Sequence, residues 1–386
     1  MLQSFIVYGF TALTLYLLSK NATKREYYLY QSSRKKLSLW NSEYILLLTI
    51  FALVVGMRYN VGVDYLTYLE EYLNLQNDRN TIRDSFEPGF LFITKLFAKS
   101  GIHYTFYFAL WGIMQLGFIL YAVKNHKYLI PYICLYIMLG PFFLTWMNGI
   151  RQTVICCFFV YISKFIYERK LIKYVICILL ASLIHKSAMI LLPLYLLGRI
   201  SPKWDNKKIN FLLLFICIIV GLTPTWFSFT SSIANILSFL DYDAYSDNIS
   251  YWTEEFSVMA WGPSRIGLLL VEMSIIWYYP LARKFYQYDK ALDYYFIFFF
   301  IGVLAYNLFA NTSYIFIRPI MYFQIFEIPL FAYIIYFLKV TKRIFPKFII
   351  SLIAYTYIFI EIIKVGYFFY TPDEKSLYKF FFNYCI

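Results

Sequence analysis

The sequence predicts an all-α protein whose helices cross a membrane many times. Of its 386 residues, 61% are hydrophobic and only 15% are charged, whereas soluble globular proteins are about half apolar and about a quarter charged. The apolar residues fall in many blocks of about 20, the length that an α-helix needs to cross the hydrocarbon core. The cations lie in short loops between these blocks, as they do in polytopic membrane proteins. These observations together predict a polytopic transmembrane helical bundle.

About ten full spans follow from the apolar blocks in chain order. Basic loops alternate with loops poor in cations, so every second loop is expected to face the cytoplasm by the positive-inside rule. The first basic loop holds Lys20, Lys24 and Arg25, which places it inside. The expected spans are residues 2–18, 44–57, 104–123, 128–147, 150–167, 210–226, 264–281, 292–309, 317–338 and 348–369.

The segment 174–198 is expected to turn back within the membrane. Lys170 precedes it and Arg199 follows it, each within a basic loop that should face the cytoplasm. The apolar run is interrupted at its middle by His185, and a single pass would put the two loops on opposite sides. The sequence therefore predicts a re-entrant helical hairpin around His185, surrounded by protein or a watery cavity. The alternative is one span of 25 residues and one exception to the positive-inside rule.

Two long segments between spans are predicted to lie on the outer face. Segment 58–102 is mixed in charge and partly helical, and segment 227–261 has five acidic residues and no Lys or Arg. An acidic loop without cations fits the outer side of the membrane. Neither segment resembles a soluble domain, so residues 1–386 are predicted to form a single integral-membrane domain.

Several classes of function are poorly supported. The net charge of +13 could suggest nucleic acid, but the cations sit in the loops that orient the spans. The six cysteines form no C-x-x-C motif, and three histidines supply a metal site poorly. The sequence also lacks a phosphate-binding Gly-rich loop. We therefore expect no nucleic acid, no metal and no cofactor, and a substrate that carries its own activation.

Three arginines lie at the outer ends of predicted spans. They are Arg58, Arg151 and Arg318, and a guanidinium fork suits phosphate or carboxylate. Arg151 follows Asn148-Gly149 and opens a helix, whose free N–H groups also favour an anion. Pro319 is expected in the first turn of its helix. The alternative for Arg58 is a side chain that snorkels to the headgroups. Repeated arginines predict an anion of high charge, such as the pyrophosphate of a lipid carrier.

Two carboxylates and one histidine accompany the arginines. Asp64, Glu87 and His185 could each accept a proton, because ionisable groups at membrane depth are costly and are functional candidates by default. The structural alternatives are a helix N-terminal acid for Glu87 and a hydrogen-bonded core residue for His185. The carboxylates inside spans are explained equally well by packing; these are Glu272, Glu327 and Glu361.

Five stretches that contain these residues form an ordered set. They are residues 56–65 with Tyr68, 87–90, 148–152, 181–188, and 317–318 with 322–323. In these stretches the sequence resembles the EpsG family of bacterial exopolysaccharide polymerases, which are related in role to Wzy-type O-antigen and capsule polymerases. The order and spacing look like those of the family over nearly the whole chain. One departure is Pro319 directly after Arg318.

The resemblance implies a glycosyltransferase at the outer face of the bacterial plasma (inner) membrane. It would join oligosaccharide repeat units carried on undecaprenyl pyrophosphate, without a nucleotide sugar. The implied partners are this lipid-linked oligosaccharide, membrane lipids, and flippase and chain-length regulator proteins. A likeness to membrane-embedded GT-C glycosyltransferases is a further analogy.

The resemblance also implies roles for the candidate residues. Electrostatic stabilisation of the leaving pyrophosphate would come from Arg58, Arg151 and Arg318. The proton of the acceptor hydroxyl would pass to one of Asp64, Glu87 and His185. The remaining substrate-binding candidates in the same motifs are Tyr65, Gln152 and Lys186.

Two other functions use the same residues. A transporter or flippase of lipid-linked sugars would need the arginines too, but the sequence shows no internal repeat of the kind many transporters have. A membrane-bound acyltransferase that modifies polysaccharide could use His185, but no site for a cytoplasmic acyl donor is evident. A purely structural scaffold is disfavoured by the cost of buried charges.

Overall fold

The computed structural model is all-helical, as the sequence predicts. It describes residues 1–33, 38–77, 79, 86–199, 204–223, 226, 262–309, 314–367 and 376–383. These residues contain no β-strand and only one isolated bridge, between Arg58 and Phe380. The predicted outer segment 227–261 lies outside the described residues.

Seven of the described helices are long and apolar enough to cross a membrane, which confirms a multi-pass membrane protein. They span Leu2–Ser32, Tyr104–Ala122, Ile150–Tyr167, Pro263–Phe285, Lys290–Phe309, Phe316–Val340 and Ile344–Lys364. The pair Lys127–Leu139 and Phe142–Asn148, bent by 63°, is either an eighth, broken span or a re-entrant loop. Its bend falls at Pro141, which has no backbone N–H for a continuous helix.

Two predicted spans correspond to shorter helices. These are α2 (Ser42–Gly56) and α11 (Lys207–Gly221), with 15 residues each, and 15 residues rise only about 22 Å. The count of about ten full spans and the likeness to GT-C enzymes therefore stay predictions.

The chain divides into two compact units, and each is described by itself. The first comprises Met1–Arg199 with Phe331–Ile386, and the second Ile200–Leu330. The predicted single domain of residues 1–386 also stays a prediction.

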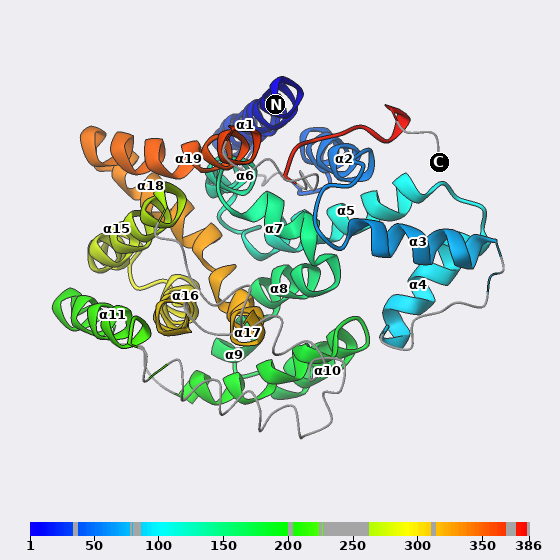
Figure 1. Ribbon diagram of the computed structural model, residues 1–386. Helices are drawn as coiled ribbons and strands as arrows, with labels where there is room; N and C mark the ends of the chain where they lie inside the picture. The colour runs from blue at the N-terminus through cyan, green and yellow to red at the C-terminus, as the bar shows by residue number, and fades with distance from the viewer. Residues whose placement is uncertain are drawn as a thin grey trace. The chain divides into compact units, whose positions relative to one another are not determined.

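The first unit is built around a chain of packed helices. α1 (Leu2–Ser33) packs against α2 and α6 (Ile130–Leu139), α2 against α5 (Tyr104–Ala122), and α5 against α8 (Ile150–Ile162) (Figure 1). Large side chains that are almost fully buried fill the centre, among them Phe51, Phe108, Trp111 and Trp146. The remaining helices of this unit are α3 (Tyr65–Gln76), α4 (Pro88–Lys99), η1 (Lys127–Leu129), α7 (Phe142–Asn148), α9 (Lys164–Tyr167), α10 (Leu171–Ser182), η2 (Lys186–Arg199), the greater part of α18 (Glu327–Val340), α19 (Ile344–Tyr367) and η3 (Phe381–Asn383).

The segment around His185 forms a helical hairpin. α10 ends at Ser182, the 3-10 helix η2 begins at Lys186, and the two arms pack against each other. The hydroxyl of Tyr174 on the first arm donates a hydrogen bond of 2.6 Å to the carbonyl of Leu191 on the second. The break at His185 is therefore where the sequence predicts it. The depth of the hairpin in a membrane stays a prediction.

The second unit contains α11, α15 (Pro263–Phe285), α16 (Lys290–Phe309), α17 (Tyr314–Gln324) and the start of α18. α16 packs against α11, α15 and α17. A bidentate ion pair fastens the ends of α15 and α16: Arg283 Nε and Nη2 donate to the two carboxylate oxygens of Asp293, at 2.8 and 3.1 Å. Such forked pairs fix geometry as well as charge.

Candidate functional site

The loop after α2 meets the junction between α7 and α8. Gly62 has a φ of +94°, and a Cβ built on it would lie 2.3 Å from the carbonyl oxygen of Met147, so only glycine fits there. The backbone N–H of Asp64 donates to Asn148 Oδ1 at 3.3 Å. Two motifs that are separate in the sequence thus form one contact, directly before Arg151.

Arg58 is buried at this contact and links the two segments by hydrogen bonds. Its side chain is fully buried, and its donors reach the carbonyls of Val55 at 2.8 Å, Val61 at 3.3 Å and Met147 at 3.4 Å. Burial lowers the pKa of Arg58 to about 10, so it remains charged at neutral pH. The hydroxyl of buried Tyr65 donates to the carbonyl of Arg58 at 2.9 Å. Arg58 and Tyr65 are therefore engaged with the protein itself.

Replacing Arg58 with methionine is expected to destabilise the protein by about 3 kcal/mol or more, because it leaves buried carbonyl groups without donors. The midpoint of thermal unfolding in detergent measures the loss. Arg169→Met is the control, since Arg169 is exposed. A stable Arg58→Met protein that makes no polymer would instead indicate a direct contact between Arg58 and substrate.

The start of α4 docks on the break of the hairpin. The backbone N–H groups of Gly89 and Phe90 donate to the carbonyl of Leu183, at 2.8 and 3.2 Å. A Cβ on Gly89 would lie 2.7 Å from that oxygen. Pro88 occupies the first helical position, where a missing N–H does no harm, and Glu87 is the N-cap residue. This docking places the Glu87 carboxylate beside His185.

Glu87 joins three segments of the chain. Its Oε1 accepts a hydrogen bond from the backbone N–H of Lys186, at 2.9 Å, and lies 3.0 Å from His185 Nδ1. Its Oε2 forms an ion pair with Arg151 Nη1. The Glu87 side chain is 5% exposed, and those of His185 and Arg151 are each 18% exposed. The carboxylate is thus buried, while both of its side-chain partners remain partly accessible.

Aromatic rings cradle the Arg151 guanidinium. Its central carbon lies 4.6 Å from the centroid of Phe86, 5.3 Å from Phe90 and 6.0 Å from Tyr68. Its buried Nε has no hydrogen-bond partner among the described residues. Cation–π contact and the Glu87 ion pair hold the group in place. The next residue, Gln152, is buried.

The environment of Glu87 favours its ionised form. Burial by itself raises the pKa of the carboxyl, but the His185 hydrogen bond, the Arg151 charge and the Lys186 N–H together outweigh it and lower the pKa to about 2. The ordinary value is 4.5. The carboxylate is therefore charged at neutral pH and accepts, rather than donates, its hydrogen bonds.

This pKa predicts an acid-dependent stability. A lowered pKa in the folded state contributes stability above pH 4.5 that is lost as the pH falls toward 2, about 3 kcal/mol in all. Glu87→Gln lacks this contribution, so its thermal midpoint should lie below that of the wild type at pH 6 and approach it near pH 2. A constant difference between the two proteins across that range would contradict the assignment.

The remaining predicted site residues are Asp64, Lys186 and Arg318. Asp64 is half-buried, and Lys186 is exposed and contributes its backbone N–H. Arg318 is half-buried in α17, in the second unit. Pro319 is the sixth residue of α17 rather than part of its first turn, because the helix starts earlier than the apolar block suggests. This corrects the expectation for Pro319.

The second unit contains a buried polar cluster that the sequence did not lead us to predict. Arg265, in the first turn of α15, lies 3.6 Å from Glu272 and hydrogen-bonds Asn307 on α16. All three side chains are buried. Arg265 lies at the start of a predicted span, as Arg151 does, so this signal was present in the sequence.

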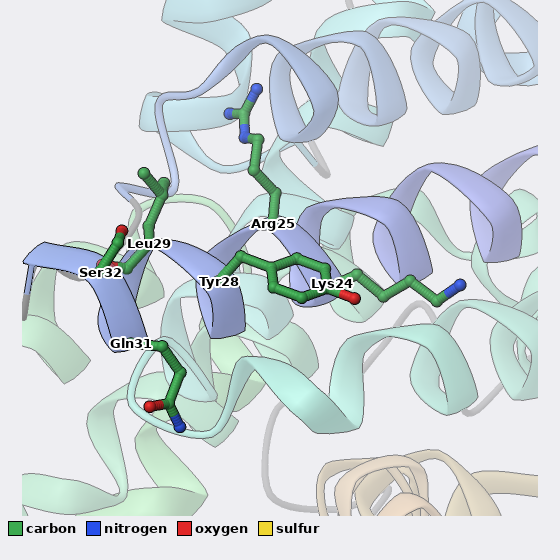
Figure 2. Close-up of a pocket in the computed structure, with 6 residues that line it drawn as sticks. All are labelled: Lys24, Arg25, Tyr28, Leu29, Gln31 and Ser32. Carbon is green, nitrogen blue, oxygen red and sulfur yellow. The ribbon is translucent and has the colours of Figure 1, made fainter.

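A shallow basic hollow lies elsewhere on the first unit. It runs along the last turns of α1 and contains none of the candidate catalytic residues (Figure 2). Its lining residues are Lys24, Arg25, Tyr28, Leu29, Gln31 and Ser32. Within the part of the chain that the structure describes, no group of three His, Cys, Asp or Glu side chains could hold a metal ion.

The comparisons with known proteins agree with the motifs. A family model described as the EpsG family matches residues 43–384, which is nearly the whole chain. No curated protein and no solved structure matches it. EpsG is a Wzy-like family of polysaccharide polymerases, so a polymerase role in exopolysaccharide synthesis follows at this general level. The chain is a multi-pass membrane protein that belongs to the EpsG family.

Proposed function

We propose that the protein joins repeat units carried on undecaprenyl pyrophosphate, at the outer face of the bacterial plasma membrane, and that Glu87, Arg151 and His185 form its reaction centre. The observation that carries the proposal is the double engagement of Glu87. Its two oxygens bind a cation suited to phosphate and an imidazole suited to proton transfer. Polymerisation on a lipid carrier needs both functions.

Arg151 is proposed to bind the leaving pyrophosphate. It is the second residue of α8, so the free N–H groups of the helix N-terminus favour an anion on the same side. The Glu87 ion pair uses Nη1, and a guanidinium has further donors. Negative charge develops on the leaving group during transfer, and a fixed cation stabilises it most at that point.

His185 is proposed as the general base. A carboxylate with a pKa of about 2 is a weak base, and both oxygens of Glu87 are already engaged. Glu87 instead accepts the Nδ1–H of His185, which leaves Nε2 as the proton acceptor. Asp64 remains the alternative base. Glu87 is then a positioning residue that acts through His185 and Arg151.

The proposed glycosyl transfer needs only the acceptor hydroxyl, the glycosyl pyrophosphate, His185 and Arg151. The acceptor hydroxyl attacks the anomeric carbon of the lipid-linked chain, and its proton passes to His185 Nε2. The bond between the anomeric carbon and the pyrophosphate oxygen breaks. Undecaprenyl pyrophosphate departs while Arg151 stabilises its negative charge. The energy comes from the glycosyl pyrophosphate bond, so no nucleotide is required.

Helix lengths support the outer face. The span Ile150–Tyr167 has 18 residues, or about 27 Å, close to the hydrocarbon thickness. Arg151 opens this span, and the basic run at Arg169 and Lys170 follows its other end. Cations favour the cytoplasmic side, which supports the opposite, outer side for the cluster. Flippase and chain-length regulator proteins are proposed as partners.

Reconstitution tests the proposal. The purified protein in vesicles, given undecaprenyl-pyrophosphate-linked repeats and no nucleotide sugar, should form polymer and release one undecaprenyl pyrophosphate for each linkage formed. Mass analysis of both products measures this. Movement of repeats across the bilayer without any polymer would overturn the proposal in favour of a flippase.

A further inference from the structure

Two lysines share a pair of tyrosine rings at one end of the first unit. The rings of Tyr121, at the end of α5, and Tyr161, at the end of α8, have centroids 5.0 Å apart. Lys124 Nζ lies 4.2 Å from the Tyr121 centroid. Lys164 Nζ lies 3.9 Å from the Tyr161 centroid and 5.8 Å from that of Tyr121. Both ammonium groups therefore lie within 5.8 Å of the centroid of one ring, that of Tyr121.

The charges of these lysines are not neutralised by carboxylates among the described residues. Lys127 and Lys170, at the same end, pair with Glu26 and Glu168 at 2.8 and 2.7 Å. Among the described residues, Lys124 and Lys164 lie over aromatic rings, and both side chains remain half-exposed. Two neighbouring cations repel each other, so an anion between them would relieve that cost.

The surroundings favour a lipid headgroup over a soluble anion. Lys124 follows the span Tyr104–Ala122, and Lys164 lies in the last turn of the span Ile150–Tyr167. Cations at the end of a span are expected near the lipid headgroups. One turn deeper, the half-exposed rings of Phe118 and Phe158 lie 4.8 Å apart and continue the same surface. A phosphate at the lysines would thus place an acyl chain along these two rings.

We infer that Lys124, Lys164, Tyr121 and Tyr161 form a binding site for the phosphodiester of an anionic glycerophospholipid. The bound lipid fastens the end of α5 to the end of α8, the helix whose other end carries Arg151. The inference does not depend on the proposed catalytic roles.

Lipid retention tests the site. The protein is extracted in detergent, incubated with phosphatidylglycerol or phosphatidylcholine, and weighed by native mass spectrometry. We expect one phosphatidylglycerol to be retained in preference to phosphatidylcholine. Each lysine near a headgroup contributes about fivefold in affinity, so Lys124→Gln with Lys164→Gln should weaken retention about twenty-fivefold. The control, Lys342→Gln with Lys347→Gln, removes the same charge from another basic loop and should retain the lipid.

Three outcomes would overturn the site. They are equal retention of the two lipids, equal loss in both double variants, and full competition by inorganic phosphate, which would identify a soluble anion instead. If the first double variant does not fold, a photoreactive phosphatidylglycerol is cross-linked to the wild-type protein. Adducts on the peptides that carry Lys124 and Lys164 support the site, and adducts confined to other peptides exclude it.

Discussion

Replacing Arg151 with alanine is expected to remove long polymer and leave single lipid-linked repeats on the outer leaflet. The loss of one fixed donor to a developing negative charge lowers kcat by about 10²–10³-fold. The rings of Phe86 and Phe90 would remain, but no cation would replace the guanidinium between them. The size of the extracted polysaccharide and the mass of the lipid-linked oligosaccharides measure the effect.

The control for this variant separates charge from folding. Arg169→Ala removes an exposed arginine of the same unit and should leave the polymer unchanged. Arg151→Ala also leaves Glu87 without its cation, so membrane insertion and amount must be matched to the wild type. Normal polymer would mean that Arg151 is structural. Repeats trapped on the inner leaflet would support a flippase.

The sequence predicted the elements of the fold better than their contacts. Hydropathy located the spans because helix length in a membrane is set by bilayer thickness. The hairpin was predicted because segment 174–198 has a basic loop on each side, and a single pass cannot place both loops in the cytoplasm. The bend at Pro141 and the shortness of α2 were not predicted, because an apolar run does not report where its backbone changes direction.

The candidate site was predicted as a set of residues without their arrangement. Glu87 contacts residues 64 and 98 positions away, and no local pattern encodes such pairs. Two arginines at helix ends show the limit of the pattern. Arg58 follows an apolar helix and Arg151 begins one, yet Arg58 is fully buried on backbone carbonyls while Arg151 is partly exposed. Only the fold distinguishes a guanidinium that supports the chain from one that can meet a ligand.

The Glu87 carboxylate contacts both Arg151 and His185, so it affects both proposed functions of the site. Glu87 neutralises Arg151 at rest, which lowers the cost of holding that cation at a partly buried position. The same charge fixes the ring of His185 through Nδ1. Pyrophosphate that approaches Arg151 would compete with Glu87 Oε2 and leave Oε1 on His185. In the proposed mechanism, binding of the donor and orientation of the base are thus linked through one side chain.

Substitution of His185 by glutamine is expected to slow polymerisation about 10²–10⁴-fold by removing the general base. The initial rate of undecaprenyl pyrophosphate release measures the loss. Glu87→Gln should lose less rate, since it weakens the orientation of the ring and leaves the imidazole in place. His126→Gln is the matched control, because that ring lies beside Tyr128, outside the cluster. A rate that is unchanged in His185→Gln but lost in Asp64→Asn would assign the base to Asp64 and limit His185 to a structural role.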